Sequence, residues 1–171
     1  KVINFGIIYG MSAYGLAQQL GIEPKVAQKY IDEYFNRYTG VQSYIEKSLE
    51  EARKKGYVTT LLQRRRYLPE ILSPTQAIRQ ASERMAINAP LQGTAADIIK
   101  VAMIRIQNRI EQEGFFTKMI MQVHDELVFE VPEGEFSRVL PMIQEKMETV
   151  MELSIPLKVS IQSGRNWAEA H

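Results

Sequence analysis

The chain of 171 residues contains no cysteine, which excludes a disulfide framework and any thiolate metal site. It also lacks an apolar run of the roughly 18 residues that a membrane-spanning helix requires, and nothing in it resembles a signal peptide. No internal repeat or low-complexity linker is present. These absences predict a globular chain of one domain or two small ones, in a reducing, cytoplasmic setting and without a membrane partner.

The chain also lacks an initiator methionine, since it begins at Lys1 inside an apolar pattern. We therefore expect it to be cut from a longer protein. Its formal net charge of +1 hides a marked asymmetry. Residues 53–109 carry 11 basic and 3 acidic side chains, a net charge of +8, whereas residues 110–171 carry 5 basic and 11 acidic ones. A basic zone of this kind suggests a surface for a polyanion, although a solvated charged face is an open alternative.

The periodicity of apolar residues predicts an α+β fold, with helices in the first two thirds and a small antiparallel sheet in the last third. Glycine and proline divide the helical pattern, and interruptions are expected at Pro90 and Gly93, with a kink or a new start at Pro141. The expected helices are two short ones within 1–20, then 24–38, 41–55, 75–113 and 135–153. The expected strands are 57–62 and 64–69 (or an extended excursion), 118–123, its partner after residue 126, and 157–162.

Lys1, Phe5 and Tyr9 form the first polar constellation, because their spacing of four residues places them on one helical face. That face offers a cation and two rings. Gly6 and Gly10 lie beside the rings and leave room for a ligand to approach the backbone. An aromatic stripe facing a core is the alternative interpretation.

Arg84, Asn88 and Gln92 repeat the same spacing inside the basic third of the chain. Arg, Asn and Gln are the side chains that reach base edges and sugar oxygens of nucleic acids. Pro90 would bend this helix and let it follow a curved ligand. The alternative is an exposed polar face without a partner.

The third constellation lies in the segment "MIMQVHDELVFEV", residues 119–131. Strand alternation places Met119, Met121 and Val123 on one face, and Leu127, Phe129 and Val131 repeat the alternation after the turn.

The turn itself is His124-Asp125-Glu126, with Gln122 and His124 on the second face of the strand. It lacks the Asn-Gly or Asp-Gly that a two-residue hairpin prefers, which suggests side chains placed for chemistry. Asp125 and Glu126 are suitable ligands for a hard cation such as Mg²⁺. A solvated acidic turn with a packed histidine is the alternative. Together, the three constellations point to metal-assisted phosphoryl transfer on nucleic acid.

Three long motifs, in matching order and spacing, resemble family A DNA polymerases of the bacterial DNA polymerase I type. "KVINFGIIYG" resembles the second half of their fingers-helix motif, and "QVHDE" resembles the carboxylate motif of their palm. "ERMAINAPLQGTAADIIK" is similar to their long palm helix, and "GRNWAEAH" to their C-terminus. The resemblance covers essentially the whole chain and implies fingers helices in residues 1–55 and a palm in residues 56–171.

The resemblance implies a role for each matching residue. Lys1 would meet the phosphates of the incoming deoxynucleoside triphosphate, Phe5 its sugar, and Tyr9 would close the insertion site near the templating base. Asp125 would be a catalytic metal ligand, with Glu126 as an auxiliary acid beside it. The residues expected to contact primer–template DNA are Arg84, Asn88 and Gln92 on the minor-groove side, and Gln122 and His124 near the primer terminus.

The sequence departs from the family pattern where the two arginines before Lys1 and the palm motif with the second metal-binding aspartate would stand. The implied function is template-directed nucleotidyl transfer in DNA replication and repair, by a monomer whose fragment is inactive alone because two-metal catalysis needs carboxylates on both sides. Two alternatives stay open. One is a nucleic-acid-binding module without catalysis. The other is a metal-dependent nuclease, which the single acidic pair disfavours.

Overall fold

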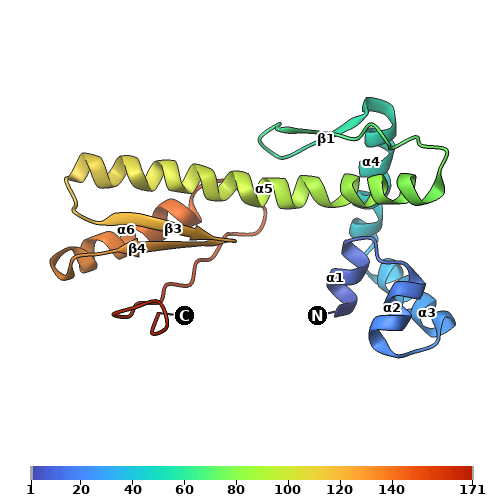
Figure 1. Cartoon of the computed structure of the whole chain (residues 1–171), viewed down its shortest axis with the longest axis horizontal. Coiled ribbons are helices and arrows are strands. Elements are labelled where there is room, and N and C mark those ends of the chain that lie inside the picture. Colours follow the sequence, from blue (N-terminus) through green and yellow to red (C-terminus); the bar gives the residue numbers. More distant parts are fainter. Residues whose placement is uncertain (1, 171) are drawn as a thin grey trace. The chain divides into compact units, whose positions relative to one another are not determined.

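A computed structural model describes residues 2–170, apart from the side chain of Val2, and confirms the α+β class (Figure 1). The described residues form two separate antiparallel sheets of two strands each, β1–β2 and β3–β4. The helices and strands are α1 (Val2–Ile8), α2 (Ala13–Leu20), α3 (Pro24–Arg37), α4 (Thr39–Lys55), β1 (Tyr57–Thr59), β2 (Arg65–Tyr67), α5 (Gln76–Glu113), β3 (Lys118–Val123), β4 (Glu126–Glu130), the 3₁₀ turn η1 (Glu133–Glu135) and α6 (Phe136–Glu148).

The chain divides into two compact units, Lys1–Thr94 and Ala95–His171, so the division falls within α5. The family resemblance places the boundary between fingers and palm after residue 55, which this division does not test. The assignment of fingers and palm therefore stays a prediction. In the described part of the chain, no helix is both long and apolar enough to cross a membrane.

Helix ends in the first unit follow local sequence signals. The Ser12 hydroxyl accepts a hydrogen bond from the Gly15 amide at 3.2 Å and caps α2. Gly21 and Gly56 end α2 and α4 with φ of 66° and 74°, a left-handed conformation that glycine adopts without steric cost. Two small cores hold the unit together: Leu16, Ala17 and Ala27 in one, and Ala52, Val58, Leu68, Ile71 and Ala86 in the other.

The expected interruption of the long helix at Pro90 and Gly93 is wrong, because α5 runs through both residues. Pro90 has no amide hydrogen, so one backbone hydrogen bond is lost. Burial of Ala86 and Ile87 compensates, because most helical stability in proteins comes from packing. The Tyr44 hydroxyl also donates to the Ile87 carbonyl at 3.0 Å, and burial raises the pKa of this tyrosine, which keeps its proton in place.

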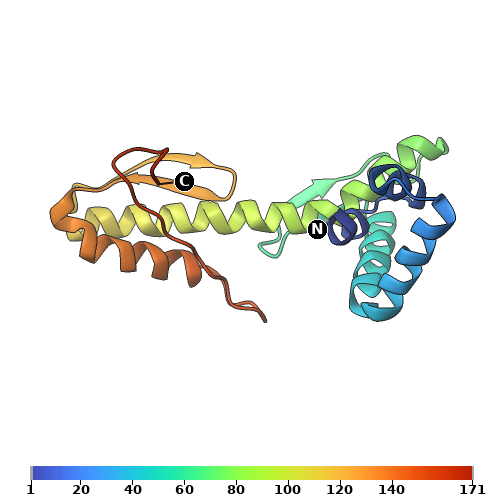
Figure 2. The ribbon, with the colours of Figure 1, turned by 90° about the horizontal axis from the view of Figure 1, so that it is seen from below.

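The second unit is built around an apolar core between the C-terminal half of α5, α6 and the β3–β4 hairpin (Figures 1 and 2). Its buried members are Ala102, Ile106, Ile110, Val139, Met142, Ile143 and Val150. Leu127, Phe129 and Val131 pack against this core, as strand alternation predicted. Met121 does not, because a β-bulge between Met119 and Met121 shifts the register and leaves Met121 exposed.

Two further expectations near the C-terminus are wrong. Residues 157–162 are not a strand, and α6 ends at Glu148, with Pro141 inside the helix and no new start. A strand needs a ladder partner. Here the Val159 amide instead donates to a Glu148 carboxylate oxygen at 3.0 Å, and the other oxygen of that carboxylate lies 3.6 Å from the Lys158 ammonium.

Glu135 joins the segment before β3 to the start of α6. Its carboxylate accepts hydrogen bonds from the Phe116 amide (2.7 Å), the Thr117 amide (3.0 Å) and the Thr117 hydroxyl (2.7 Å). Desolvation raises the pKa of Glu135, but these bonds and the charge of Arg138 outweigh it, so the pKa lies below the ordinary value of 4.5.

A group with a lowered folded-state pKa stabilises the fold above its ordinary pKa, and this contribution is lost as the pH falls through the lowered value. We therefore expect the melting temperature of the chain to fall as the pH drops below 4.5. Glu135→Gln should lower the melting temperature at neutral pH and weaken its dependence on acid. Thermal unfolding at several pH values measures both. Glu133→Gln, in the same turn, removes an equal charge and is the control; equal effects of the two substitutions would contradict this account.

Candidate nucleic-acid interface and carboxylate turn

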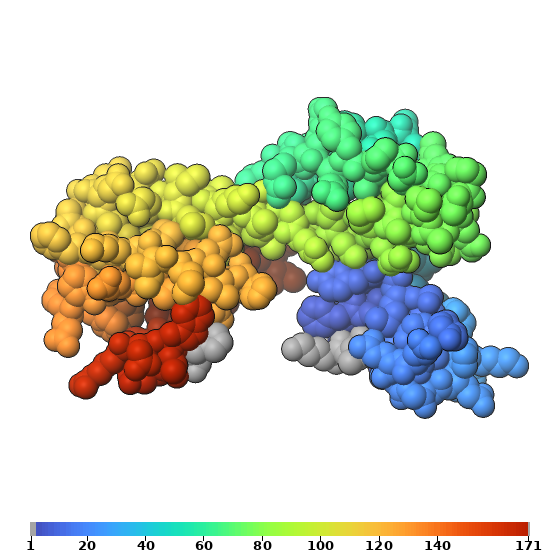
Figure 3. All heavy atoms as spheres, in the orientation of Figure 1, coloured from blue at the N-terminus to red at the C-terminus, as the bar shows by residue number. Residues whose placement is uncertain are grey.

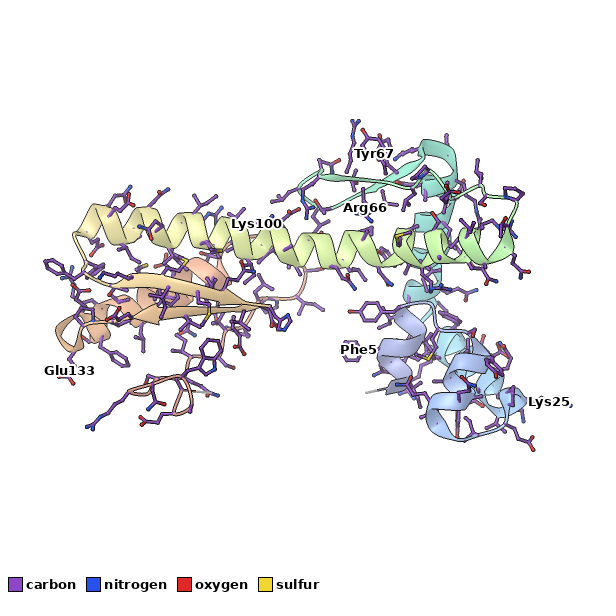
Figure 4. All side chains as sticks on the ribbon, in the orientation of Figure 1. Phe5, Lys25, Arg66, Tyr67, Lys100 and Glu133 are labelled. Carbon is purple, nitrogen blue, oxygen red and sulfur yellow. The ribbon has the colours of Figure 1, made fainter. Side chains whose placement is uncertain are left out.

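Phe5 lies in α1 and Tyr9 in the turn directly after its last residue, where the Tyr9 amide still donates to the Phe5 carbonyl at 3.0 Å, and the two ring centroids are 5.9 Å apart. Phe5 is 51% exposed and projects away from its helix (Figure 4), so it is not part of a buried aromatic stripe. Both rings line a cleft of about 900 Å³ in the first unit, whose lining includes Gly6, Gly10 and Arg84. Lys1, the third member of this face, lies outside the described residues.

The backbone conformation at Gly10, which lines this cleft, requires a glycine. Its φ of 76° is left-handed, and a side chain at this position would be strained whatever the space around it. The glycine therefore lets the chain leave α1 beside the aromatic face and reach the N-cap of α2 at Ser12.

Arg84, Asn88 and Gln92 line a second groove of the first unit, about 640 Å³ in volume, between α5 and the β1–β2 hairpin. Figure 3 shows the atoms of the hairpin packed against those of α5. The Arg84 and Gln92 side chains are exposed. Asn88 is half-buried, and its Oδ1 atom has no hydrogen-bond partner among the described residues. The structure thus brings these three side chains together on one wall.

The opposite wall carries arginines that were not among the sequence-predicted site residues. Arg64, Arg65 and Arg66 all line the groove, and all are exposed. The Arg66 guanidinium lies 3.9 Å from the Met85 sulfur of α5, on the side of the hairpin that faces the helix (Figure 4). The signal that could have revealed them is the run of three arginines inside the basic third of the chain.

The hairpin holds its arginines through aromatic neighbours. Tyr57 and Tyr67 are a cross-strand pair with ring centroids 5.7 Å apart, and the Arg65 guanidinium lies 4.8 Å from the centre of the Tyr57 ring. Cross-strand aromatic pairs stabilise short hairpins, and a cation over a ring adds about 0.5–1 kcal/mol at an exposed site. A two-stranded ribbon is marginally stable alone, so these contacts keep the basic wall in shape.

The His124-Asp125 turn closes the β3–β4 hairpin in the second unit, between the paired residues Val123 and Glu126. His124 has a φ of 53°, whereas that of Asp125 is not positive. This pattern matches a type II′ turn, in which the first central residue is ordinarily glycine. A residue other than glycine in such a conformation costs on the order of 1–3 kcal/mol. Backbone strain of this kind clusters at active sites and ligand-binding sites, which makes this turn a candidate site.

The four site residues predicted in and beside this turn are all exposed, namely Gln122, His124, Asp125 and Glu126. This exposure excludes a packed histidine. The Gln122 amide donates to the His124 carbonyl at 3.1 Å and ties the second face of the strand to the turn. Asp125 lies at the tip and Glu126 begins β4 directly after it, so the two carboxylates are neighbours in the sequence.

The donor set of the turn fits a partial magnesium site. No cluster of three or more His, Cys, Asp and Glu side chains that could hold a metal occurs within residues 2–170. Mg²⁺ is commonly bound by one or two carboxylates, with water and substrate phosphates completing its octahedron. Asp125 and Glu126 could supply that carboxylate share.

A basic groove lined by arginine and amide side chains, together with a carboxylate turn in a small sheet, is typical of enzymes that transfer nucleotidyl groups on nucleic acids. Comparison with family models identifies the family within this class. Residues 1–169 match the model of DNA polymerase family A, and the chain belongs to that family.

The chain resembles bacterial members of the family along its whole length. It is 53% identical to a DNA polymerase I of Pseudomonas aeruginosa over 171 residues, and 46% identical to a thermostable DNA polymerase I of Thermus filiformis over 170 residues. These matches cover 100% and 99% of this chain but only 19% and 20% of those relatives. A solved structure, the polymerase domain of Pol1 from M. smegmatis in complex with DNA primer-template and dNTP, matches with a TM-score of 0.96 and 47% identity, covering 99% of this chain and 30% of that one.

The positive φ of His124 predicts opposite changes in stability when glycine replaces either of the two residues of the turn. His124→Gly should relieve the positive φ and raise the free energy of unfolding by about 0.5–1 kcal/mol. The matched substitution Asp125→Gly, at a residue without positive φ, should lower it, because glycine gains only unfolded-state entropy there. Denaturant unfolding of both variants measures the difference. A loss of stability in His124→Gly as large as that in Asp125→Gly would show that the histidine is not strained.

Proposed function

We propose that this chain is part of a DNA-directed DNA polymerase that performs template-directed deoxynucleotidyl transfer. The observation that carries the proposal is the groove in the first unit, where Arg84, Asn88 and Gln92 face three arginines of the hairpin, in a chain of DNA polymerase family A. The similar polymerase domain from M. smegmatis was solved in complex with DNA primer-template and dNTP, which supports these partners.

The helix α1 would bind the incoming nucleotide. Lys1 would neutralise its phosphates, and the exposed Phe5 ring would lie against its sugar. Tyr9, whose ring lies beside Phe5, would close the insertion site by stacking near the templating base. Both rings line the cleft and are exposed, so a flat ligand could reach them.

The groove would bind primer–template DNA. The guanidinium of Arg84 and the amides of Asn88 and Gln92 suit sugar and base-edge atoms in the minor groove. Arg65 and Arg66 suit phosphates on the opposite wall, because arginine binds phosphate with two parallel hydrogen bonds. Gln122 and His124, exposed beside the carboxylates, would lie near the primer terminus.

Asp125 would ligate catalytic Mg²⁺, and Glu126 would act as an auxiliary acid. A metal pair, when bound, supplies charge stabilisation to the attacking and leaving oxygens. This chain contributes one carboxylate side, and the opposing aspartate of the family pattern stands outside its sequence, so the chain alone should not extend a primer. The enzyme would act as a monomer in DNA replication and repair, in the bacterial cytoplasm and with the nucleoid.

A second candidate is a nucleic-acid-binding module without catalysis. One observation favours it: every residue that lines the basic groove belongs to the first unit, whereas the carboxylate turn belongs to the second. Binding would then occur without any dependence of function on Asp125.

The chain should bind primer–template DNA with strong salt dependence, because each phosphate contact releases counterions. We expect affinity to fall steeply between about 0.05 and 0.2 M salt. Arg65→Gln and Arg66→Gln should each lower the log–log salt slope by about 1 if the arginine contacts a phosphate. Fluorescence anisotropy with labelled duplex measures the slope. Arg37→Gln, which removes an arginine from α3 and not from the groove, is the control. Binding that is absent at low salt, or indifferent to salt, would refute the proposed interface.

Catalysis can be tested by exchanging the matching 19% of the P. aeruginosa polymerase for this chain. The chimera should extend a primer with Mg²⁺ and all four nucleotides. Asp125→Asn should abolish extension while leaving duplex affinity unchanged within a few-fold, since the substitution keeps shape and removes the metal ligand. Glu130→Gln, an exposed acid of the same hairpin, should retain extension. If Asp125→Asn extends normally, or loses DNA binding equally, Asp125 is not a catalytic ligand.

A further inference from the structure

The turn of the β1–β2 hairpin is attached to α5 at the segment that follows Pro90. The Leu61 amide donates to the Thr94 hydroxyl at 3.0 Å, and the Arg64 guanidinium donates to the Gly93 carbonyl at 3.0 Å. The Thr94 hydroxyl itself donates to the Pro90 carbonyl at 2.6 Å. Thr94 is buried, so its hydroxyl is oriented by one bond and receives the other. All of these residues belong to the first unit.

Thr60 organises the turn that makes these contacts. Its amide donates to the Arg64 carbonyl, its carbonyl accepts from the Gln63 amide, both at 3.0 Å, and its hydroxyl accepts from the Arg64 amide at 3.2 Å. Gln63 takes a φ of 63°, which lets the chain reverse within this short loop. Thr60 is 5% exposed, whereas Leu61 and Leu62 after it are exposed, so Thr60 is the residue that anchors the turn.

Gly93 determines how closely the turn approaches the helix. A Cβ added at Gly93 would lie 2.6 Å from the Thr60 methyl carbon and 3.4 Å from the Arg64 guanidinium. Real Cβ atoms do not approach other carbons so closely, so any side chain at position 93 would displace the turn. Glycine inside a helix lowers stability by about 1 kcal/mol relative to alanine, and Gly93 stands inside α5 despite this cost.

We propose that Thr60, Gly93 and Thr94 are positioning residues of the nucleic-acid groove, which hold the hairpin at the distance from α5 that lets both walls contact one duplex. The inference rests on the proposed function and goes beyond it, because none of the three is expected to bind DNA through its side chain. Arg65 and Arg66 follow the docked turn directly in β2, and the Arg66 guanidinium lies beside Met85 of α5, so displacement of the turn moves this guanidinium away from the wall of Arg84, Asn88 and Gln92.

Position matters here because phosphate contacts are short and directional. A charge-assisted hydrogen bond between guanidinium and phosphate requires a distance of about 2.7–2.9 Å, so a shift of the hairpin by the width of one methyl group removes it. A contact that served stability alone would change the melting temperature when broken but would leave the number of phosphate contacts intact. This difference makes the proposal testable.

The test compares four forms of the full chain: the unchanged protein, Gly93→Ala, Thr60→Ser, and the double variant. Gly93→Ala should weaken binding to primer–template duplex and lower the log–log salt slope by about 1 to 2, corresponding to one or two lost phosphate contacts. Thr60→Ser removes the methyl group that an alanine at position 93 would meet and keeps the hydroxyl that Arg64 uses. It should therefore restore the slope in the double variant and change little alone. Non-additivity of this kind identifies a direct contact.

Two further measurements keep the outcomes distinct. Hydrogen exchange of the Leu61 amide should be slow in the unchanged protein and fast in Thr94→Val, which lacks the accepting hydroxyl, while Thr94→Ser should restore protection. Arg66→Gln should lower the salt slope of the unchanged protein but not that of Gly93→Ala. If the unchanged chain does not bind duplex at low salt, the proposed function fails. If it binds, but Gly93→Ala keeps the same slope, or the double variant is not restored while its circular dichroism stays native, the positioning role is overturned.

Discussion

The absence of a side chain at Gly93 is the constraint on which the candidate groove depends. It lets a buried threonine methyl group of the hairpin turn reach the surface of α5, and it exposes a carbonyl that the Arg64 guanidinium contacts. Without this approach, a hairpin of two three-residue strands would have few contacts to hold it. At the end of the hairpin away from its turn, a small core also attaches it to the rest of the unit; this core consists of Ala52, Val58, Leu68, Ile71 and Ala86.

The continuity of α5 through Pro90 follows from the same region. Proline removes one backbone bond, and nearby carbonyls of the helix accept side-chain hydrogen bonds from Tyr44, Thr94 and Arg64. These bonds fix the helical face on which Arg84, Asn88 and Gln92 lie. The charge asymmetry of the chain thus has a structural counterpart, because the basic third forms both walls of one groove, while the acidic last third presents carboxylates at the turn of a separate unit.

Much of the fold could be predicted from local signals. Ser12, Gly21 and Gly56 predict helix ends because helix caps depend on neighbours in sequence. The alternation of Leu127, Phe129 and Val131 identified the residues of the hairpin that pack against the core. The errors arose where tertiary contacts override local preference. Packing keeps Pro90 helical, a bulge exposes Met121, and residues 157–162 have no ladder partner in the described part of the chain. The site residues were predicted from spacing and family resemblance, but the hairpin arginines were not, since only folding brings them opposite Arg84.

The central claim is that one groove of the first unit binds primer–template DNA from both walls, and amide chemical shifts report this directly. The chain is labelled with ¹⁵N and titrated with a short primer–template duplex at low salt. The account predicts that the largest shifts fall on Arg65, Arg66, Arg84, Asn88 and Gln92 together, and that added salt reverses them. Shifts confined to one wall, or centred on α3 with its exposed lysines while the groove stays silent, would contradict it.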